Sequence, residues 1–304
     1  MKLEKISYKG WDNCLQLSNE FATLVVTLDV GPRIISYALK GGKNVFKNYE
    51  EMMGVTEGAE WMIFGGHRLW HAPEDALRTY APDFGPVAHE WDGVTLTLRP
   101  PEESGTGIRK ELDVSLEPNS AGVRVVHRLY NHNLWDVTLA PWALSVMDAG
   151  ARAIVPQEPF GPHPDFLLPA RPLVLWRFTD MSDPRWHWGR KYIQLQQDPG
   201  KPMPQKLGLF NHHGWAACAV NACLFVKKYP ALSDAPHADM GANTEIFTNG
   251  DMLELETLGP LARIPSGGQV AHVEHWGLFP VKVDEREENI EQSVLPCVDK
   301  VSNV

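Results

Sequence analysis

The stretch IFTNGDMLELETLGP (residues 246–260) decides the fold. Its Asn249-Gly250 pair lies between two β-prone runs, which is typical of a two-residue type I′ turn in a β-hairpin. In a strand over 251–258, the period of two puts Glu254 and Glu256 on one face, with Met252 and Leu258, and Leu253 and Leu255 on the other. The leucines predict a face buried in a core. The glutamate face is either a solvated outer surface or the lining of a ligand cleft.

The rest of the chain is also typical of strands. Only residues 284–295 predict a helix, which Pro296 would end. No series of helices alternates with the strands, which excludes a doubly wound α/β fold. The sequence therefore predicts an all-β protein, a large antiparallel sandwich over residues 1–304 as one domain, with 156–172 as a long connection inside it. The other predicted strands are 22–30, 32–39, 94–100, 110–118, 122–131, 137–147, 173–179, 191–196, 215–220 and 223–229.

Composition excludes several classes of partner. The formal net charge of -10 argues against binding to nucleic acid, where clustered Lys and Arg supply the affinity. The sequence contains no run of about 18 apolar residues and no secretory leader, so we expect no membrane partner and a cytoplasmic protein. The four cysteines are scattered, which disfavours both a disulfide framework and a zinc site.

Tryptophan is abundant, with eleven residues, and several lie beside His, Arg or Asn. The segment FGGHRLWHAPE (64–74) is the densest example. Indole rings offer large rigid contact area that suits the apolar faces of sugar rings. If this segment is extended, His67 and His71 share a face about 13 Å apart. A helix would bring the two rings together as metal ligands, but the glycines and Pro73 oppose a helix, so we expect no metal.

Two parts of the sequence resemble a known family. The run LELETLGPLARIPSGGQVAHVEHWGLF (253–279) is similar to the C-terminal signature of the galactose mutarotase (aldose 1-epimerase) superfamily, and DVGPRIISYALKGGKNVF (29–46) looks like its opening hairpin. The resemblance implies a β-supersandwich of galactose mutarotase type with a sugar-binding cleft on a concave sheet. It implies a small-molecule saccharide as the partner and no cofactor.

The resemblance also implies roles for individual residues. Glu256 falls where the family places its catalytic base, which takes the proton of the anomeric hydroxyl while an acid protonates the ring oxygen. His67 and Arg68 match, by position, a His and an Arg that hold the sugar, and His71 lies close behind. The predicted catalytic residues are Glu256, His67 and His71, and the predicted substrate-binding residues are Arg68, Trp70, Trp142, His212, His213 and Glu254.

One departure from the family pattern leaves the activity open. The acid of the family is a His, but the matching stretch VTLAPWALSVM (137–147) has Trp142 or Ala143 at that place. The first hypothesis is therefore an aldose 1-epimerase-like isomerase in which His67 or His71 supplies the acid. The alternatives are a catalytically inactive carbohydrate-binding relative, or a lyase or hydrolase on the same sandwich fold, because a fold does not fix a reaction.

Overall fold

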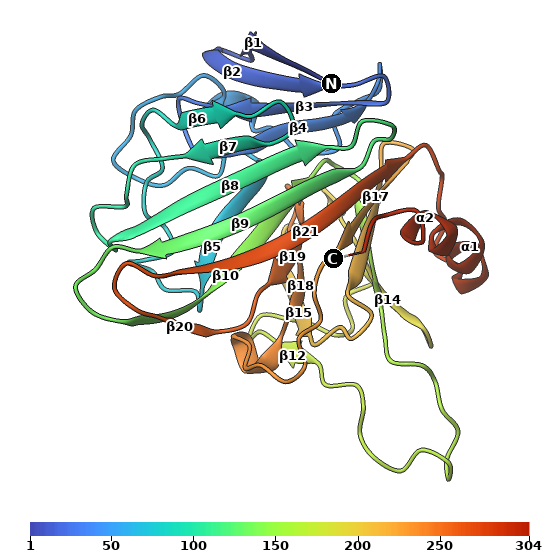
Figure 1. Cartoon of the computed structure of the whole chain (residues 1–304). Coiled ribbons are helices and arrows are strands. Elements are labelled where there is room, and N and C mark those ends of the chain that lie inside the picture. The colour runs from blue at the N-terminus through green and yellow to red at the C-terminus, as the bar shows by residue number, and fades with distance from the viewer. Residues whose placement is uncertain (304) are drawn as a thin grey trace.

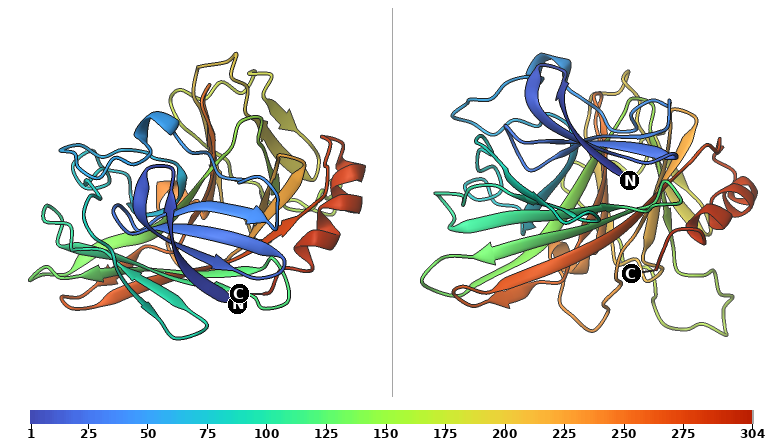
Figure 2. Two further views of the ribbon diagram at one scale, coloured as in Figure 1. Left: turned by 90° about the horizontal axis from the view of Figure 1, so that it is seen from above. Right: turned by 45° about the horizontal axis from the view of Figure 1, so that its top comes forward.

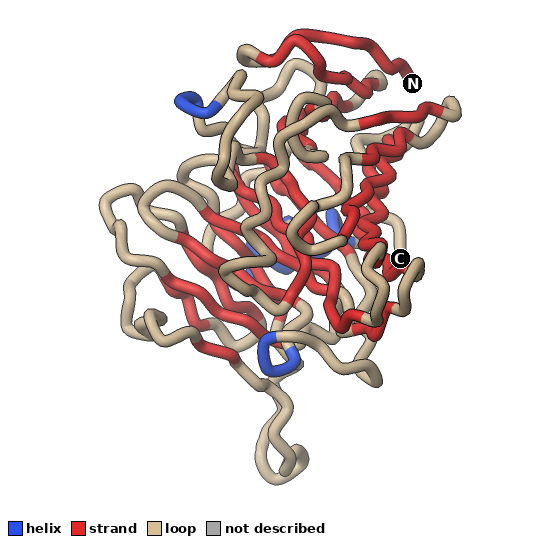
Figure 3. Tube along the Cα trace, turned by 90° about the vertical axis from the view of Figure 1, so that its left-hand side faces the viewer, coloured by secondary structure: helices blue, strands red, loops and turns tan. Residues whose placement is uncertain are grey.

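Two large β-sheets lie face to face in the computed structural model, which describes residues 1–303 (Figure 1). Every strand pairing is antiparallel. Figure 3 shows strands through the body of the molecule and only short helical turns around it. The prediction of an all-β antiparallel supersandwich is confirmed.

The two sheets are named by the order of their strands. The first sheet runs β1 (Lys2–Tyr8), β2 (Trp11–Ser18), β3 (Ala22–Thr27), β4 (Ile34–Leu39), β5 (Gly66–Ala72), β10 (Val137–Met147), β19 (Leu253–Leu258), β18 (Thr244–Thr248), β15 (Gln205–Leu209) and β12 (Val174–Leu175), with β20 (Ala262–Ile264) paired to β10. The second sheet runs β13 (Trp186–Trp188), β14 (Tyr192–Gln196), β11 (Arg152–Pro156), β16 (Trp215–Val220), β17 (Cys223–Lys228), β21 (Gln269–Phe279), β9 (Val123–Asn131), β8 (Ile108–Leu116), β7 (Leu96–Arg99) and β6 (Ala88–Trp91).

The main core fills the space between the sheets. From β19 it takes Leu253 and Leu255, both fully buried, as the leucine pattern predicts. From the second sheet it takes side chains such as Leu112 and Phe225. β5 and its neighbour β4 approach each other closely at Gly66. A Cβ atom at this position would lie only 2.6 Å from the carbonyl oxygen of Ile34. Gly66 also has a φ of 73°, so this position favours glycine for two reasons.

The hairpin at 246–260 forms with a wider turn than predicted. Thr248 pairs with Leu253, so four residues connect β18 to β19 instead of two. The side-chain oxygen of Asn249 accepts hydrogen bonds from the backbone N–H groups of Asp251 and Met252, at 2.8 and 3.0 Å. Neither Asn249 nor Gly250 has the positive φ of a type I′ turn. The prediction of that turn type is wrong because the Asn side chain closes a longer loop.

The C-terminal helix is shorter than predicted and is followed by a second one. α1 (Glu287–Ser293) and α2 (Leu295–Val298) pack beside the second sheet (Figure 2). Ile290 and Val298 of these helices belong to one hydrophobic cluster with Leu224 and Val226 of β17. Pro296 lies in the first turn of α2, where its missing N–H costs nothing. The remaining helical turns are η1 (Glu50–Met52) and η2 (Asp239–Gly241). The Pro-rich connection between β11 and β12 runs out from the body as a long loop (Figure 1).

None of the helices in residues 1–303 has the length and apolarity needed to cross a membrane.

Replacing Leu255 with Ala tests the packing between the sheets. Leu255 is fully buried in the main core, so the Leu255→Ala variant should lose about 2–5 kcal/mol of unfolding free energy through lost burial and the cavity left behind. Urea denaturation measures this loss. Leu134→Ala is the control, because Leu134 is 90% exposed and its variant should change the free energy by less than about 0.5 kcal/mol. Equal losses in the two variants would contradict the assigned core.

Candidate functional site

Strand alternation separates the predicted site residues into two groups. On β5, Arg68 and Trp70 point to the outer face of the first sheet, where Trp142 of β10 and Glu254 of β19 also lie. His67 points to the inner face, toward the second sheet, where it contacts His127 of β9. Glu256 lies on the outer face, where it contacts Trp142. The predicted partnership of Glu256 with His67 is therefore wrong, because the first sheet lies between them.

An aromatic pocket of about 280 Å³ opens on the outer face of the first sheet. Its floor comes from β5, β10, β15 and β19, and its walls come from loops before and after β5 and from the segment that follows β12. Its main lining side chains are Trp61, Arg68, Trp70, Tyr80, Trp142, Trp176, Lys206 and Glu254. Glu254 of β19 thus lines a pocket, and Glu256 on the same face is fully buried, so this face is not a solvated surface.

Arg68 and Glu254 form an ion pair in the wall of the aromatic pocket. The Nη2 of Arg68 lies 2.8 Å from Oε1 of Glu254. The guanidinium lies beside the rings of Trp61 and Trp70, whose centroids are 5.3 and 4.2 Å from its carbon Cζ. Arg68 is only 3% exposed, yet its Nε and Nη1 have no hydrogen-bond partner, and neither does the indole N–H of Trp70. Buried donors without acceptors are costly, so these groups are available to a ligand.

Lys206 lies between two carboxylates at the bottom of the same pocket. Its Nζ is 2.7 Å from Glu245 and 3.1 Å from Glu256, whose Oε2 also accepts the indole N–H of Trp142 at 2.8 Å. The ammonium lies over the rings of Trp142 and Trp176, at 4.8 and 4.7 Å. Glu256 is fully buried, and its Oε1 has no hydrogen-bond partner.

These contacts shift the pKa values of all three groups. Burial raises the pKa of Glu245 well above its ordinary value, and burial also raises that of Glu256, against the opposing attraction of Lys206. Burial alone would lower the pKa of Lys206, but the two carboxylates outweigh it and raise that pKa. Two buried carboxylates share one ammonium, so one of them holds a proton more readily than an exposed glutamate does. The group can therefore both accept and release protons.

A chain of buried histidines connects the two sheets. The carbonyl oxygen of His272 can only accept, so His127 donates its Nδ1–H to it, at 3.1 Å. Neutral His127 then accepts at Nε2 from the Nε2–H of His67, at 2.7 Å, and the Nδ1 of His67 accepts from the hydroxyl of Ser145, at 2.8 Å. Burial lowers the pKa of His67 well below its usual range and that of His127 to about 4, which keeps both rings neutral. The hydrogen-bond chain thus fixes both tautomers.

Glu274 completes this inter-sheet histidine network. Its two oxygens accept from the ammonium of Lys227 at 2.9 Å, the hydroxyl of Thr257 at 2.5 Å and the indole N–H of Trp276 at 2.7 Å. The Thr257 oxygen in turn lies 2.8 Å from Nε2 of His272, whose pKa burial lowers to about 3. Burial opposes ionisation of Glu274, but Lys227 and the polar neighbours outweigh it and lower its pKa. Each named polar side chain of this network therefore has a partner.

The same network holds a donor set that a metal could use. Nitrogen atoms of His67 and His127 and a carboxylate oxygen of Glu274 all lie within 4.8 Å of one another, and the three residues are buried. However, the two ring nitrogens are at hydrogen-bonding distance from each other, and Lys227 already places a positive charge on Glu274. This geometry is that of a closed hydrogen-bond network. The absence of a metal stays a prediction.

The other predicted histidines lie away from the aromatic pocket. His71 is buried on the inner side of β5, with Nε2 3.5 Å from Glu103. His212 and His213 lie in the turn before β16, where His213 bonds to the carbonyl oxygen of Gln157 at 3.0 Å and the side chain of His212 is 51% exposed. None of the three lines the pocket. The structure brings together Arg68, Trp70, Trp142, Glu254 and Glu256 of the predicted set.

Sequence reasoning missed several residues of this region. Lys206 and Glu245 gave no signal, because β15 was not predicted and the wider hairpin turn changes which residue lies opposite Glu256. Trp61 and Trp176 belong to loops whose position depends on the tertiary fold. For Lys227 and Glu274 of the inter-sheet network, the sequence predicts only that they lie in strands.

Acid titration of stability tests the inter-sheet histidine network. In the unfolded chain each ring takes up a proton near pH 6.5, whereas His127 and His272 stay neutral in the folded protein down to about 4 and about 3. The unfolded state then binds more protons, so the unfolding free energy should fall as pH drops from 6.5 toward 5, by about 1.4 kcal/mol per pH unit for each buried ring. Urea denaturation from pH 8 to 5 measures the slope.

His127→Gln should reduce this slope by the contribution of one buried ring, about 1.4 kcal/mol per pH unit. His89→Gln, at an exposed position, should leave the slope unchanged. A wild-type stability that stays flat between pH 7 and 5 would contradict neutral buried rings.

Comparisons with known proteins support the fold. No protein-family model and no curated protein sequence matches the chain. Among solved structures, it is similar to a galactose mutarotase-like protein from Lactobacillus casei (TM-score 0.56, 10% identity, covering 88% of this chain and 100% of that one). It is also similar to the Slr1438 protein from Synechocystis (TM-score 0.59, 11% identity). That match covers 91% of this chain and 99% of the other.

A third similar structure is a TPR-domain containing protein from Parabacteroides distasonis (TM-score 0.60, 13% identity). The match covers 89% of this chain but only 48% of that one, so this chain spans about half of that protein's length. Together with the sheet order and the position of β19, these likenesses show that the chain has the galactose mutarotase-like fold.

Proposed function

We propose that the protein binds a saccharide in the aromatic pocket. The observation that carries this proposal is the set of buried donors without partners, Arg68 Nε and Nη1 and Trp70 Nε1, beside the carboxylate of Glu254. A sugar hydroxyl both accepts and donates, so neighbouring hydroxyls can accept from the guanidinium and donate to the carboxylate. The flanking tryptophans hold the polar groups in place and give apolar area for ring C–H groups.

The fold is consistent with this ligand class. A structure with the same fold is named galactose mutarotase-like, which makes a sugar the first ligand to test. Fold likeness alone does not fix function, so the proposal depends on the side chains of the pocket.

Saccharide binding can be tested by saturation-transfer NMR with a panel of monosaccharides and short oligosaccharides. At least one sugar should bind the wild type, and Arg68→Met should weaken that sugar about 10-fold or more, because a hydrogen bond to a charged group contributes about 1.5–3 kcal/mol. Arg263→Met is the matched control, because Arg263 is exposed and pairs with Asp136 outside the pocket. Equal weakening in both variants, or no binding to any sugar, would count against the proposal.

A second candidate function is sugar epimerisation of the aldose 1-epimerase type. The group of Glu245, Lys206 and Glu256 favours it, because two buried carboxylates with raised pKa values share the ammonium of Lys206, which lines the pocket. Glu256 would take the proton of the anomeric hydroxyl while Lys206 gives a proton to the ring oxygen, and the ring carbon–oxygen bond breaks. Once Glu256 is neutral it no longer stabilises the charge on Lys206, which then becomes a stronger acid.

In this scheme Lys206 takes the role first given to His67 or His71. Glu256 is fully buried behind Trp142 and Lys206, so these side chains must move apart when the sugar binds.

Mutarotation kinetics test this second candidate. The wild type should accelerate the equilibration of freshly dissolved α-glucose or α-galactose, followed by NMR, and both Glu256→Gln and Lys206→Met should lower the rate by about 100-fold or more. Arg263→Met should keep the full rate. Saccharide binding without any acceleration by the wild type would leave a binding protein and rule out the epimerase.

A further inference from the structure

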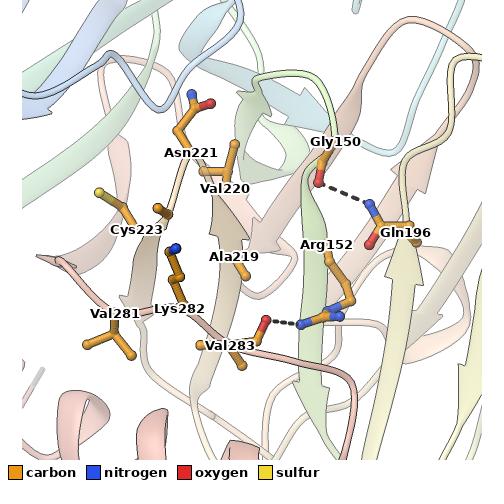
Figure 4. A pocket seen from close by; sticks show the side chains of 11 residues that line it. Gly150, Arg152, Gln196, Ala219, Val220, Asn221, Cys223, Val281, Lys282 and Val283 are labelled. Atoms are coloured by element: carbon orange, nitrogen blue, oxygen red, sulfur yellow. Dashed lines mark hydrogen bonds between the residues drawn. The ribbon is translucent and has the colours of Figure 1, made fainter.

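A second pocket lies far from the aromatic pocket in the fold, at one end of the second sheet. Figure 4 shows it between the start of β11, the hairpin of β16 and β17, and residues 281–283 after β21. Its volume is about 340 Å³. It shares no lining residue with the aromatic pocket.

The charge of this pocket is opposite to that of the whole chain. The formal net charge of the protein is -10, yet Arg152 and Lys282 line the pocket and no Asp or Glu does. Lys282 is exposed. Among residues 1–303, no carboxylate oxygen lies within 4.0 Å of its ammonium nitrogen, so it forms no ion pair. The positive charge of Lys282 is therefore available to a ligand.

Arg152 has donor capacity that the protein does not use. Its Nη2 donates to the carbonyl oxygen of Val283 at 2.5 Å, which fixes the guanidinium against the pocket wall. Its Nη1 lies 3.5 Å from Glu285, whose side chain is 56% exposed, so this ion pair is long and screened by water. Its Nε is buried and has no hydrogen-bond partner. A ligand with acceptor oxygens could receive the hydrogen bonds that Arg152 does not make within the protein.

The neutral polar side chains of the pocket are already engaged. The amide of Gln196 donates to the carbonyl oxygen of Gly150 at 3.0 Å, as Figure 4 shows. The amide of Asn221 donates to the carbonyl oxygen of Asn44 at 3.1 Å and to Asp148 at 2.8 Å. Ligand recognition therefore depends on the two cations.

We propose that this pocket binds the phosphate group of a small phosphorylated molecule. A guanidinium fixed by the backbone and an exposed ammonium together suit a doubly charged oxyanion with several acceptor oxygens. A volume of about 340 Å³ also leaves room for the group that carries the phosphate. This binding site is independent of saccharide binding in the aromatic pocket.

Titration of the protein of residues 1–304 with inorganic phosphate at low ionic strength tests the proposal. Binding is followed by the chemical shifts of the backbone amides. The amides of residues 150–152, 219–223 and 281–283 should shift saturably with a Kd of about 1 mM or lower. Arg152→Gln should weaken binding at least about 10-fold and Lys282→Gln about 3-fold or more, because each removes a charged donor.

Two further variants make the test specific. Glu285→Gln should tighten phosphate binding, since it removes the carboxylate that competes for Arg152. Lys43→Gln removes one positive charge at an exposed position outside the pocket and should leave the Kd unchanged. Because Lys282 is exposed, Lys282→Gln keeps the test valid even where Arg152→Gln lowers stability. Shifts that never saturate, or equal weakening by Lys282→Gln and Lys43→Gln, would overturn the proposal.

Discussion

The two-residue period of β19 organises both polar regions of this protein. Glu254 and Glu256 point to the outer face of the first sheet, where they meet Arg68 and Lys206. Thr257, the next residue, points inward to His272 and Glu274 of the second sheet. One strand thus supplies the acceptors of the aromatic pocket and also holds the inter-sheet histidine network. A one-residue shift of register in β19 would exchange the two faces and disrupt both regions.

Charge balance separates the two regions chemically. On the inner side one carboxylate, Glu274, accepts from an ammonium, a hydroxyl and an indole N–H. Burial opposes its ionisation, but the charge of Lys227 outweighs burial and lowers its pKa. On the outer side Glu245 and Glu256 share a single ammonium, and their pKa values are raised. The inner network is therefore suited to holding the sheets together. The outer group has perturbed pKa values, which cluster at functional sites in proteins.

The sequence predicted the fold better than the site. Alternating leucines were enough to place Glu254 and Glu256 on the face away from the core, and β-branched runs located β3, β4, β9 and β10. β5 gave no such signal, because all of its residues are buried and neither face is marked by exposed polar residues. The family resemblance therefore placed His67 beside Glu256, whereas the register of β5 turns it inward. Lys206 and Glu245 depend on pairings between strands that local patterns do not determine.

The place of β21 has a consequence for how the chain acquires its structure. This strand lies between β17 and β9, in the middle of the second sheet, although it comes last in the sequence. Until residues 269–279 have left the ribosome, β9 and β17 each present an open edge, and the second sheet exists as two separate halves. Long-range closure of this kind makes folding slow and exposes unpaired edges to other chains. Nascent chains of this protein therefore expose two unpaired strand edges to association with other chains until β21 is added.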